Sequence, residues 1–137
     1  MRMATLARLQ GVYFFMTGVW PLLSMRTFEA VTGRKRDRWL VKTVGVLITV
    51  IGASLVAVRR PAAPTTLLAV GSAAALGSVD VVYSLKGRIS RVYLLDAVLE
   101  ALLVAGWLTL LRGGRQMATT TPNVRRAQAE PAGTIDP

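Results

Sequence analysis

The sequence predicts an all-α membrane protein in which four transmembrane helices form an antiparallel bundle. Apolar residues make up 53% of the 137 residues, above the usual share in soluble domains. They gather in four blocks of about 20 residues, the length of helix that crosses a bilayer core, and the connections between the blocks are short. Helices are expected because an isolated open strand would leave its backbone groups unpaired in lipid.

The first two blocks cover about residues 6–24 and 39–58. The first begins among basic residues, as a signal peptide does, but no small-residue cleavage site follows it, so we interpret it as a retained transmembrane helix. In the second block Gly45, Thr49 and Gly52 share one helix face, which favours close packing against another helix.

The third and fourth blocks cover about residues 65–85 and 92–111. The third is rich in Ala, Gly and Ser and is expected to be the most enclosed helix. The fourth carries Ala97, Ala101 and Ala105 as one stripe at helical spacing. Because small residues allow helices to approach each other in lipid, these patterns favour a tight bundle or an oligomer of it.

Two polar segments complete the predicted organisation. In the loop at about residues 25–38, Phe28 and Val31 either dip into the membrane interface as a short amphipathic turn or belong to an ordinary solvated loop. The transmembrane domain is expected to occupy residues 1–112. The tail at 113–137 is polar and rich in Pro, Gly and Thr, and it is expected to be disordered.

The charge pattern indicates that the basic residues face a membrane surface. The net charge is +10, and the basic residues lie between apolar blocks, where they meet lipid headgroups, so nucleic-acid binding is not expected. The 17 basic residues divide eight to nine between the two sides, so the positive-inside rule sets no orientation. We expect a multi-pass protein of the bacterial inner (plasma) membrane with cytoplasmic termini, an arrangement common in small four-helix proteins. The residues predicted to contact lipid headgroups, unless their segment is only a topology signal, are Arg34, Lys35, Arg36, Arg38 and Trp39.

Composition also excludes several kinds of site. With no cysteine and no histidine, the chain cannot form disulfides, thiolate metal sites or an HExxH zinc site. Walker loops, dinucleotide fingerprints and nucleophile elbows are absent from the sequence. We therefore predict no metal, no cofactor and no catalytic residue.

The run YLLDAVLEALLVAGW, at residues 93–107, carries two acids in an apolar block. Asp96 and Glu100 are four residues apart and share one helix face, and Asp80 lies near the end of the preceding block on the same side of the membrane. A charge at the centre of a transmembrane helix costs about 2.5–3.5 kcal/mol, so these acids need partners or a polar environment. The candidates for a ligand or ion pocket at this level are Glu100, Asp96, Asp80, Lys42, Tyr83 and Tyr93.

Glu100 lies deepest in its block, and the sequence leaves three states open for it. It pairs with a base such as Lys42, stays protonated, or lines a cavity filled with water or a ligand. The structural alternative for the whole group is an internal ion-pair and hydrogen-bond network that fixes the helix register. A second polar stripe consists of Gln10, Tyr13 and Thr17. These side chains either form hydrogen bonds between helices or belong to a site.

Three segments within residues 8–111, FEAVTG, WLVKTVG and YLLDAVLE, carry a resemblance to a known group. The chain resembles a family of small bacterial four-helix integral membrane proteins without an assigned function. The resemblance implies a polytopic membrane protein and supplies no catalytic or binding residues.

These observations lead to three functional hypotheses. The first is a non-enzymatic bundle that binds a lipid or small amphiphile or acts as a structural subunit, with membrane lipids as partners and a homo-oligomer as a further option. The second is a small proton- or cation-coupled transporter that uses the intramembrane acids. The third is a membrane enzyme in which Glu100 and Asp96 act as general acid and base.

Overall fold

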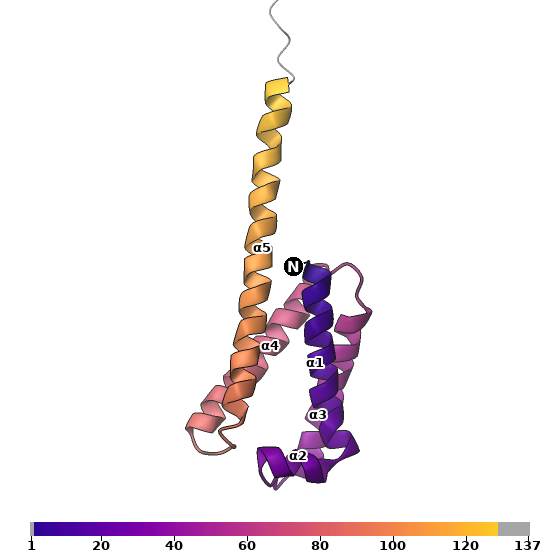
Figure 1. The fold of residues 1–137 in the computed structure, drawn as a ribbon, viewed down its shortest axis with the longest axis vertical. Coiled ribbons are helices and arrows are strands. Elements are labelled where there is room, and N and C mark those ends of the chain that lie inside the picture. Colours follow the sequence, from indigo (N-terminus) through magenta and orange to yellow (C-terminus); the bar gives the residue numbers. More distant parts are fainter. Residues whose placement is uncertain (1, 129–137) are drawn as a thin grey trace, which may run out of the picture.

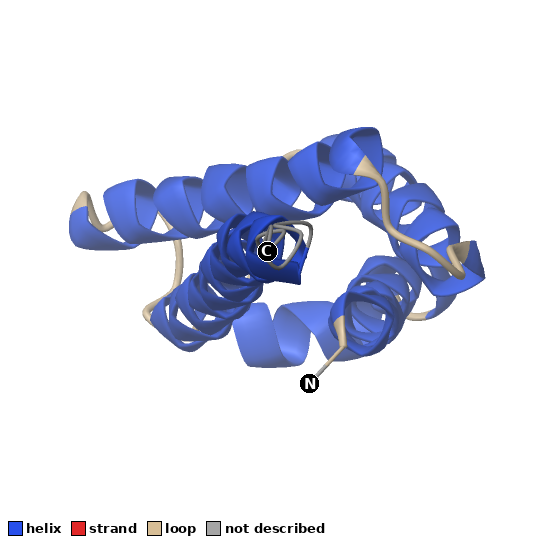
Figure 2. Ribbon diagram, turned by 90° about the horizontal axis from the view of Figure 1, so that it is seen from above, coloured by secondary structure: helices blue, strands red, loops and turns tan. Residues whose placement is uncertain are grey.

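The computed structural model describes residues 2–128, with side chains described as far as Gly114. This part of the chain is all-α and contains no strand, and the view along the bundle shows helices joined by short loops (Figure 2). The elements are α1 (Met3–Leu23), α2 (Met25–Thr32), α3 (Arg38–Ala57), α4 (Ala63–Leu85) and α5 (Tyr93–Gln128), as labelled in Figure 1.

Among the described residues, three helical stretches are long and apolar enough to cross a membrane. They are α3, α4 and the part of α5 from Tyr93 to Gly114. The all-α class is therefore confirmed, and so is the presence of several helices that could span a membrane. The first predicted span forms α1, a helix of 21 residues, but it is not one of these three. Arg8 and Gln10 lower its mean hydropathy, so the count of four crossings is not confirmed.

The helices form two pairs, α1 with α3 and α4 with α5. Glycines let the backbones of α1 and α3 touch: a Cβ added to Gly18 would lie 2.7 Å from the carbonyl oxygen of Gly45, and one added to Gly52 would lie 2.6 Å from that of Gly11. The sequence predicted the close-packing face of α3. The sequence analysis did not single out the matching face of α1, where Gly11 and Gly18 are also seven residues apart.

The two pairs are joined at the end of the molecule that holds the N-terminus (Figure 1). The Gln10 side chain, fully buried in α1, donates from Nε2 to the carbonyl oxygen of Ala69 in α4 at 2.7 Å. It accepts from the indole Nε1 of Trp107 in α5 at 2.8 Å. We call these two hydrogen bonds the Gln10 clasp. Around it lies an apolar core that includes Leu6 and Leu55, both almost completely buried.

The opposite end carries α2 and the turn between α4 and α5 (Figure 1). The predicted short amphipathic turn is a helix of eight residues that begins after Ser24 and ends at Gly33, whose φ of +84° favours glycine. The ring of Phe28 packs edge-on against Trp20 at 5.6 Å between centroids. Val31 is 48% exposed, so of the two apolar residues expected at the interface, Phe28 faces the protein and Val31 faces outward.

The structure continues α5 as a helix to Gln128. The disorder expected for the tail from residue 113 stays a prediction. Once a helix is nucleated, each further residue that is fixed adds one backbone hydrogen bond, so extending a helix is easier than starting one. The apolar part of α5 supplies that nucleus, so the helix extends into a polar segment that pattern analysis assigns to a tail. The remainder of that tail, residues 129–137, lies outside the described residues.

Candidate functional site

A cavity of about 310 Å³ lies between the two helix pairs, on the side of the molecule that carries α2. Its wall is mostly apolar, with contributions from all five helices. Asp80 from α4 and Asp96 and Glu100 from α5 also line it. The volume is at the lower end of the range for small-molecule sites, which are concave, mostly apolar and carry a few polar groups.

Glu100 is the most enclosed of the three acids. Only 2% of its surface is exposed, and its Oε2 atom has no hydrogen-bond partner among the described residues. Gly77 of α4 faces it: a Cβ at Gly77 would lie 3.0 Å from the Cβ of Glu100, so the absence of a side chain there lets α4 approach α5 at this level. The helical spacing of four residues brings Asp96 onto the same cavity face, as predicted.

Asp80 completes the group of acids from the neighbouring helix. It is 7% exposed and lies one turn beyond Gly77 on α4. Within the part of the chain whose side chains are described, no ion pair involves Asp80, Asp96 or Glu100. The structure therefore brings the three predicted acids to one cavity without pairing any of them to a base.

The other predicted pocket residues divide into two groups. Tyr93 lines the cavity, whereas Lys42 and Tyr83 do not. Lys42 is exposed on α3 and makes no ion pair with a described residue, so the proposed pairing of Lys42 with Glu100 is not present. Tyr83 is 47% exposed, and its ring contacts the side-chain nitrogen of Lys86 at 5.8 Å.

The second predicted stripe, on α1, also divides. Gln10 forms the clasp, so its role is helix–helix hydrogen bonding. Tyr13 and Thr17 line the cavity. The Thr17 hydroxyl donates to the backbone oxygen of Tyr13 at 2.9 Å, whereas the Tyr13 hydroxyl is buried and has no partner among the described residues. The cavity is thus lined, on opposite sides, by two residues that each have a buried polar atom without a hydrogen-bond partner among the described residues.

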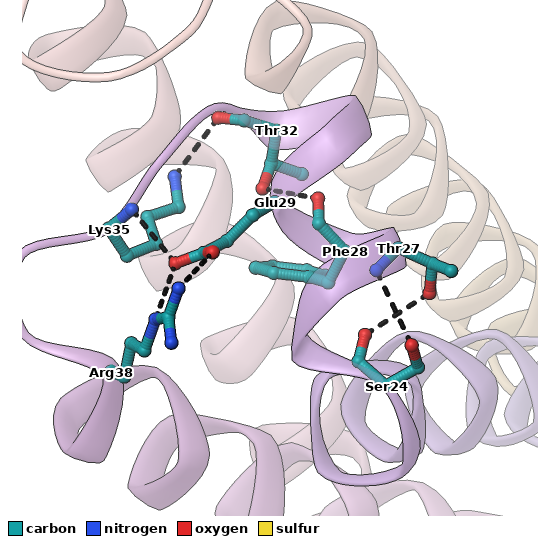
Figure 3. A network of polar contacts seen from close by, with 7 residues as sticks. All are labelled: Ser24, Thr27, Phe28, Glu29, Thr32, Lys35 and Arg38. Atoms are coloured by element: carbon teal, nitrogen blue, oxygen red, sulfur yellow. Dashed lines mark hydrogen bonds and ion pairs between the residues drawn. The ribbon is translucent and has the colours of Figure 1, made fainter.

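The loop after α2 is held by Glu29, a residue that the sequence analysis did not single out (Figure 3). Its carboxylate accepts from Arg38 Nε at 3.0 Å and from Arg38 Nη2 at 2.7 Å, and from the backbone N–H of Lys35 at 3.1 Å. These hydrogen bonds lower the pKa of Glu29 below its ordinary value of 4.5, and the hydrogen bond from the Arg38 guanidinium has the largest effect. The side-chain nitrogen of Lys35 donates to the carbonyl oxygen of Thr32 at 3.1 Å.

This network changes the roles expected for the basic loop. Lys35 was expected at the lipid surface, but it lines the cavity, and its Nζ lies 4.6 Å from the ring centroid of Tyr93. Arg38 is bound to Glu29. Its side chain nevertheless stays exposed, as do the other predicted headgroup contacts Arg34, Arg36 and Trp39.

The arrangement favours binding of a cation over metal chemistry. In the described residues, no group of three His, Cys, Asp or Glu side chains is placed to hold a metal ion. Three carboxyl groups at the edge of an apolar space, when ionised, outnumber the one ammonium group that lines it, that of Lys35, and would attract a further cation. An organic cation with an apolar part matches both the charge and the wall of this cavity.

Comparisons with known proteins found no matching family model, curated protein or solved structure. The resemblance to small bacterial four-helix membrane proteins therefore rests on the segments quoted above.

Proposed function

We propose that this protein is a non-enzymatic, multi-pass protein of the bacterial inner membrane that binds a small amphiphile carrying a positive group. The observation that carries the proposal is Glu100, which is 2% exposed, lines the 310 Å³ apolar cavity and has an Oε2 atom without a hydrogen-bond partner among the described residues. A buried acceptor without a hydrogen bond costs free energy, which a bound cation offsets. The apolar wall would take the hydrocarbon part of the same molecule.

The proposal includes α1 as a fourth crossing, with both termini on the cytoplasmic side. Supporting it, α1 packs backbone to backbone along the apolar helix α3, from the level of Gly11 to that of Gly18. A helix packed this closely along a spanning helix shares its depth in the bilayer. Lipid headgroups would contact Arg34, Arg36 and Trp39 at the α2 end.

Single-cysteine variants test the topology cleanly because the chain has no cysteine of its own. Cysteines placed at Ala62, in the α3–α4 connection, and near the N-terminus at Ala4 should react with an impermeant maleimide from the same side of sealed vesicles. A cysteine at Ser90, before α5, should react only from the opposite side. Labelling of Ala4→Cys and Ser90→Cys from one side would remove the fourth crossing.

Ligand binding is tested with decylammonium as the cationic probe and decanol as its neutral counterpart. Calorimetry on the purified full chain in nanodiscs should show saturable binding of the cation and much weaker binding of the alcohol. Glu100→Gln, which keeps the shape of the side chain, should reduce binding of the cation at least tenfold, whereas Asp37→Asn, outside the cavity, should not. Equal affinities of wild type and Glu100→Gln would refute the proposal.

A second candidate, a proton- or cation-coupled transporter, is favoured by the asymmetry of the molecule. The Gln10 clasp joins the two helix pairs at one end, whereas the cavity separates them at the other. A transporter needs such a site that opens toward one side at a time. Proteoliposomes with an imposed pH gradient should then show a flux that is lost in Glu100→Gln. The absence of any difference from protein-free vesicles would exclude this candidate.

A further inference from the structure

Two residues that line the same cavity from opposite helix pairs each carry a buried polar atom without a hydrogen-bond partner among the described residues. One is Oε2 of Glu100, on α5, and the other is the hydroxyl oxygen of Tyr13, on α1. Buried polar atoms in folded proteins are almost always hydrogen-bonded, so a pair of exceptions at one cavity needs a physical account. A carboxylate accepts hydrogen bonds, and a tyrosine hydroxyl both accepts and donates them. A ligand with at least two donors therefore satisfies both atoms.

The aromatic rings of the cavity, in contrast, already have partners. The Lys35 ammonium lies over Tyr93 at 4.6 Å, Phe28 packs against Trp20 at 5.6 Å, and Tyr13 packs against Phe14 at 5.7 Å. Quaternary ammonium ions are recognised through aromatic faces, because they have no N–H to donate. The unsatisfied groups of this cavity are oxygen acceptors, which favours a cation that donates hydrogen bonds.

We propose that the cavity selects a protonated primary or secondary alkylamine over its tertiary and quaternary counterparts. One N–H of the ammonium donates to Glu100 Oε2 and a second donates to the Tyr13 hydroxyl oxygen, so the cation bridges α5 and α1. This inference rests on the proposed function and specifies the class of ligand. An apolar cavity of about 150 Å³ accommodates benzene, so about 310 Å³ accommodates roughly twelve non-hydrogen atoms, the size of decylammonium.

A methylation series of one amine tests the selection. Decylamine and its N-methyl, N,N-dimethyl and N,N,N-trimethyl derivatives carry three, two, one and no N–H groups when charged. Calorimetry with the full chain in nanodiscs at neutral pH should give similar affinities for the first two. Affinity should then fall roughly tenfold at each later step, because each step removes one charge-assisted hydrogen bond. A decylamine with two methyl groups on the carbon beside nitrogen controls for bulk and should bind like decylamine.

Two substitutions assign the steps to the two atoms. Tyr13→Phe should remove the difference between the secondary and tertiary amines, and Tyr83→Phe, which lies outside the cavity, should leave the whole series unchanged. Glu100→Gln should flatten the series. Correct folding of each variant is checked by its melting temperature.

The outcomes separate the two proposals. If none of the amines binds, the proposed function fails, and this inference fails with it. If the amines bind but affinity stays level or rises with methylation, the selection is refuted while the proposed function stands. The selection is refuted equally if the bulk control binds as weakly as the trimethyl compound, or if Tyr13→Phe and Tyr83→Phe behave alike.

Discussion

Substitution of Gln10 by leucine should separate the contribution of the clasp from that of the surrounding apolar core. Leucine keeps most of the volume but removes both hydrogen bonds, which leaves the fully buried indole N–H of Trp107 without an acceptor. Interhelical hydrogen bonds in membrane proteins contribute about 0.6 kcal/mol on average and about 1.7 kcal/mol at most. A buried donor left unsatisfied costs about 1–3 kcal/mol. Since both partners are completely buried, we expect Gln10→Leu to lower the free energy of unfolding by about 1–2 kcal/mol.

A double-mutant cycle with Trp107→Phe isolates the hydrogen bond from the packing lost with the smaller ring. The free energy of unfolding is measured by denaturant titration in mixed micelles for wild type, both single variants and the double variant. The coupling energy should be about 1 kcal/mol, so the double variant should be less destabilised than the sum of the single variants. Additive effects, within the error of the titration, would show that the hydrogen bond between Trp107 and Gln10 contributes no specific energy and would refute its part in joining the helix pairs.

Three further predictions concern other parts of the molecule. Gly52→Ala should destabilise the protein by about 1–3 kcal/mol, because the new Cβ would lie 2.6 Å from the Gly11 carbonyl oxygen, whereas Gly71→Ala, with nothing within 4 Å, should not. The melting temperatures of the two variants check this. Because the pKa of Glu29 is lowered in the folded protein, its stabilisation of the loop is present above its ordinary value of 4.5 and is lost as pH falls through the folded pKa. The fluorescence of Trp20, whose indole N–H donates to Thr27 of α2, should report that transition, and Glu29→Gln should abolish it. Finally, the protein should remain in the membrane fraction after an alkaline carbonate wash, because α3, α4 and α5 are long and apolar enough to span; release as a soluble monomer would contradict this.

The sequence predicted those features that depend on local pattern. Apolar blocks located α3, α4 and the first part of α5. The spacing of Asp96 and Glu100, together with the position of Asp80 at the same level, predicted that the three acids meet at one place. These inferences succeed because helical periodicity alone decides which residues share a face.

The features that the sequence missed depend on which helices become neighbours. The loop residue Lys35 reaches the cavity because α2 lies at the cavity end and Glu29 fixes the chain after it. Lys42, the base that the sequence suggested as a partner for Glu100, is exposed on α3. Tyr13 was placed on the correct face of α1, but only the separation of the two helix pairs shows that its hydroxyl is left without a partner. No single-sequence pattern encodes that separation.

The clasp and the proposed ammonium site connect the same two helix pairs, so a ligand that binds only the folded state should offset the loss of the clasp. The clasp links α1 to α4 and α5, and an ammonium between Tyr13 and Glu100 would link α1 to α5 about one turn away along α1 and about two turns away along α5. A ligand at a hundred times its dissociation constant stabilises the folded state by about 2.7 kcal/mol, which exceeds the loss expected from Gln10→Leu. Saturating decylamine should therefore restore the stability of Gln10→Leu to at least that of the ligand-free wild type, and it should fail to do so when Glu100→Gln is added. A rescue that survives the loss of Glu100 would show that the amine stabilises the protein from somewhere other than this cavity.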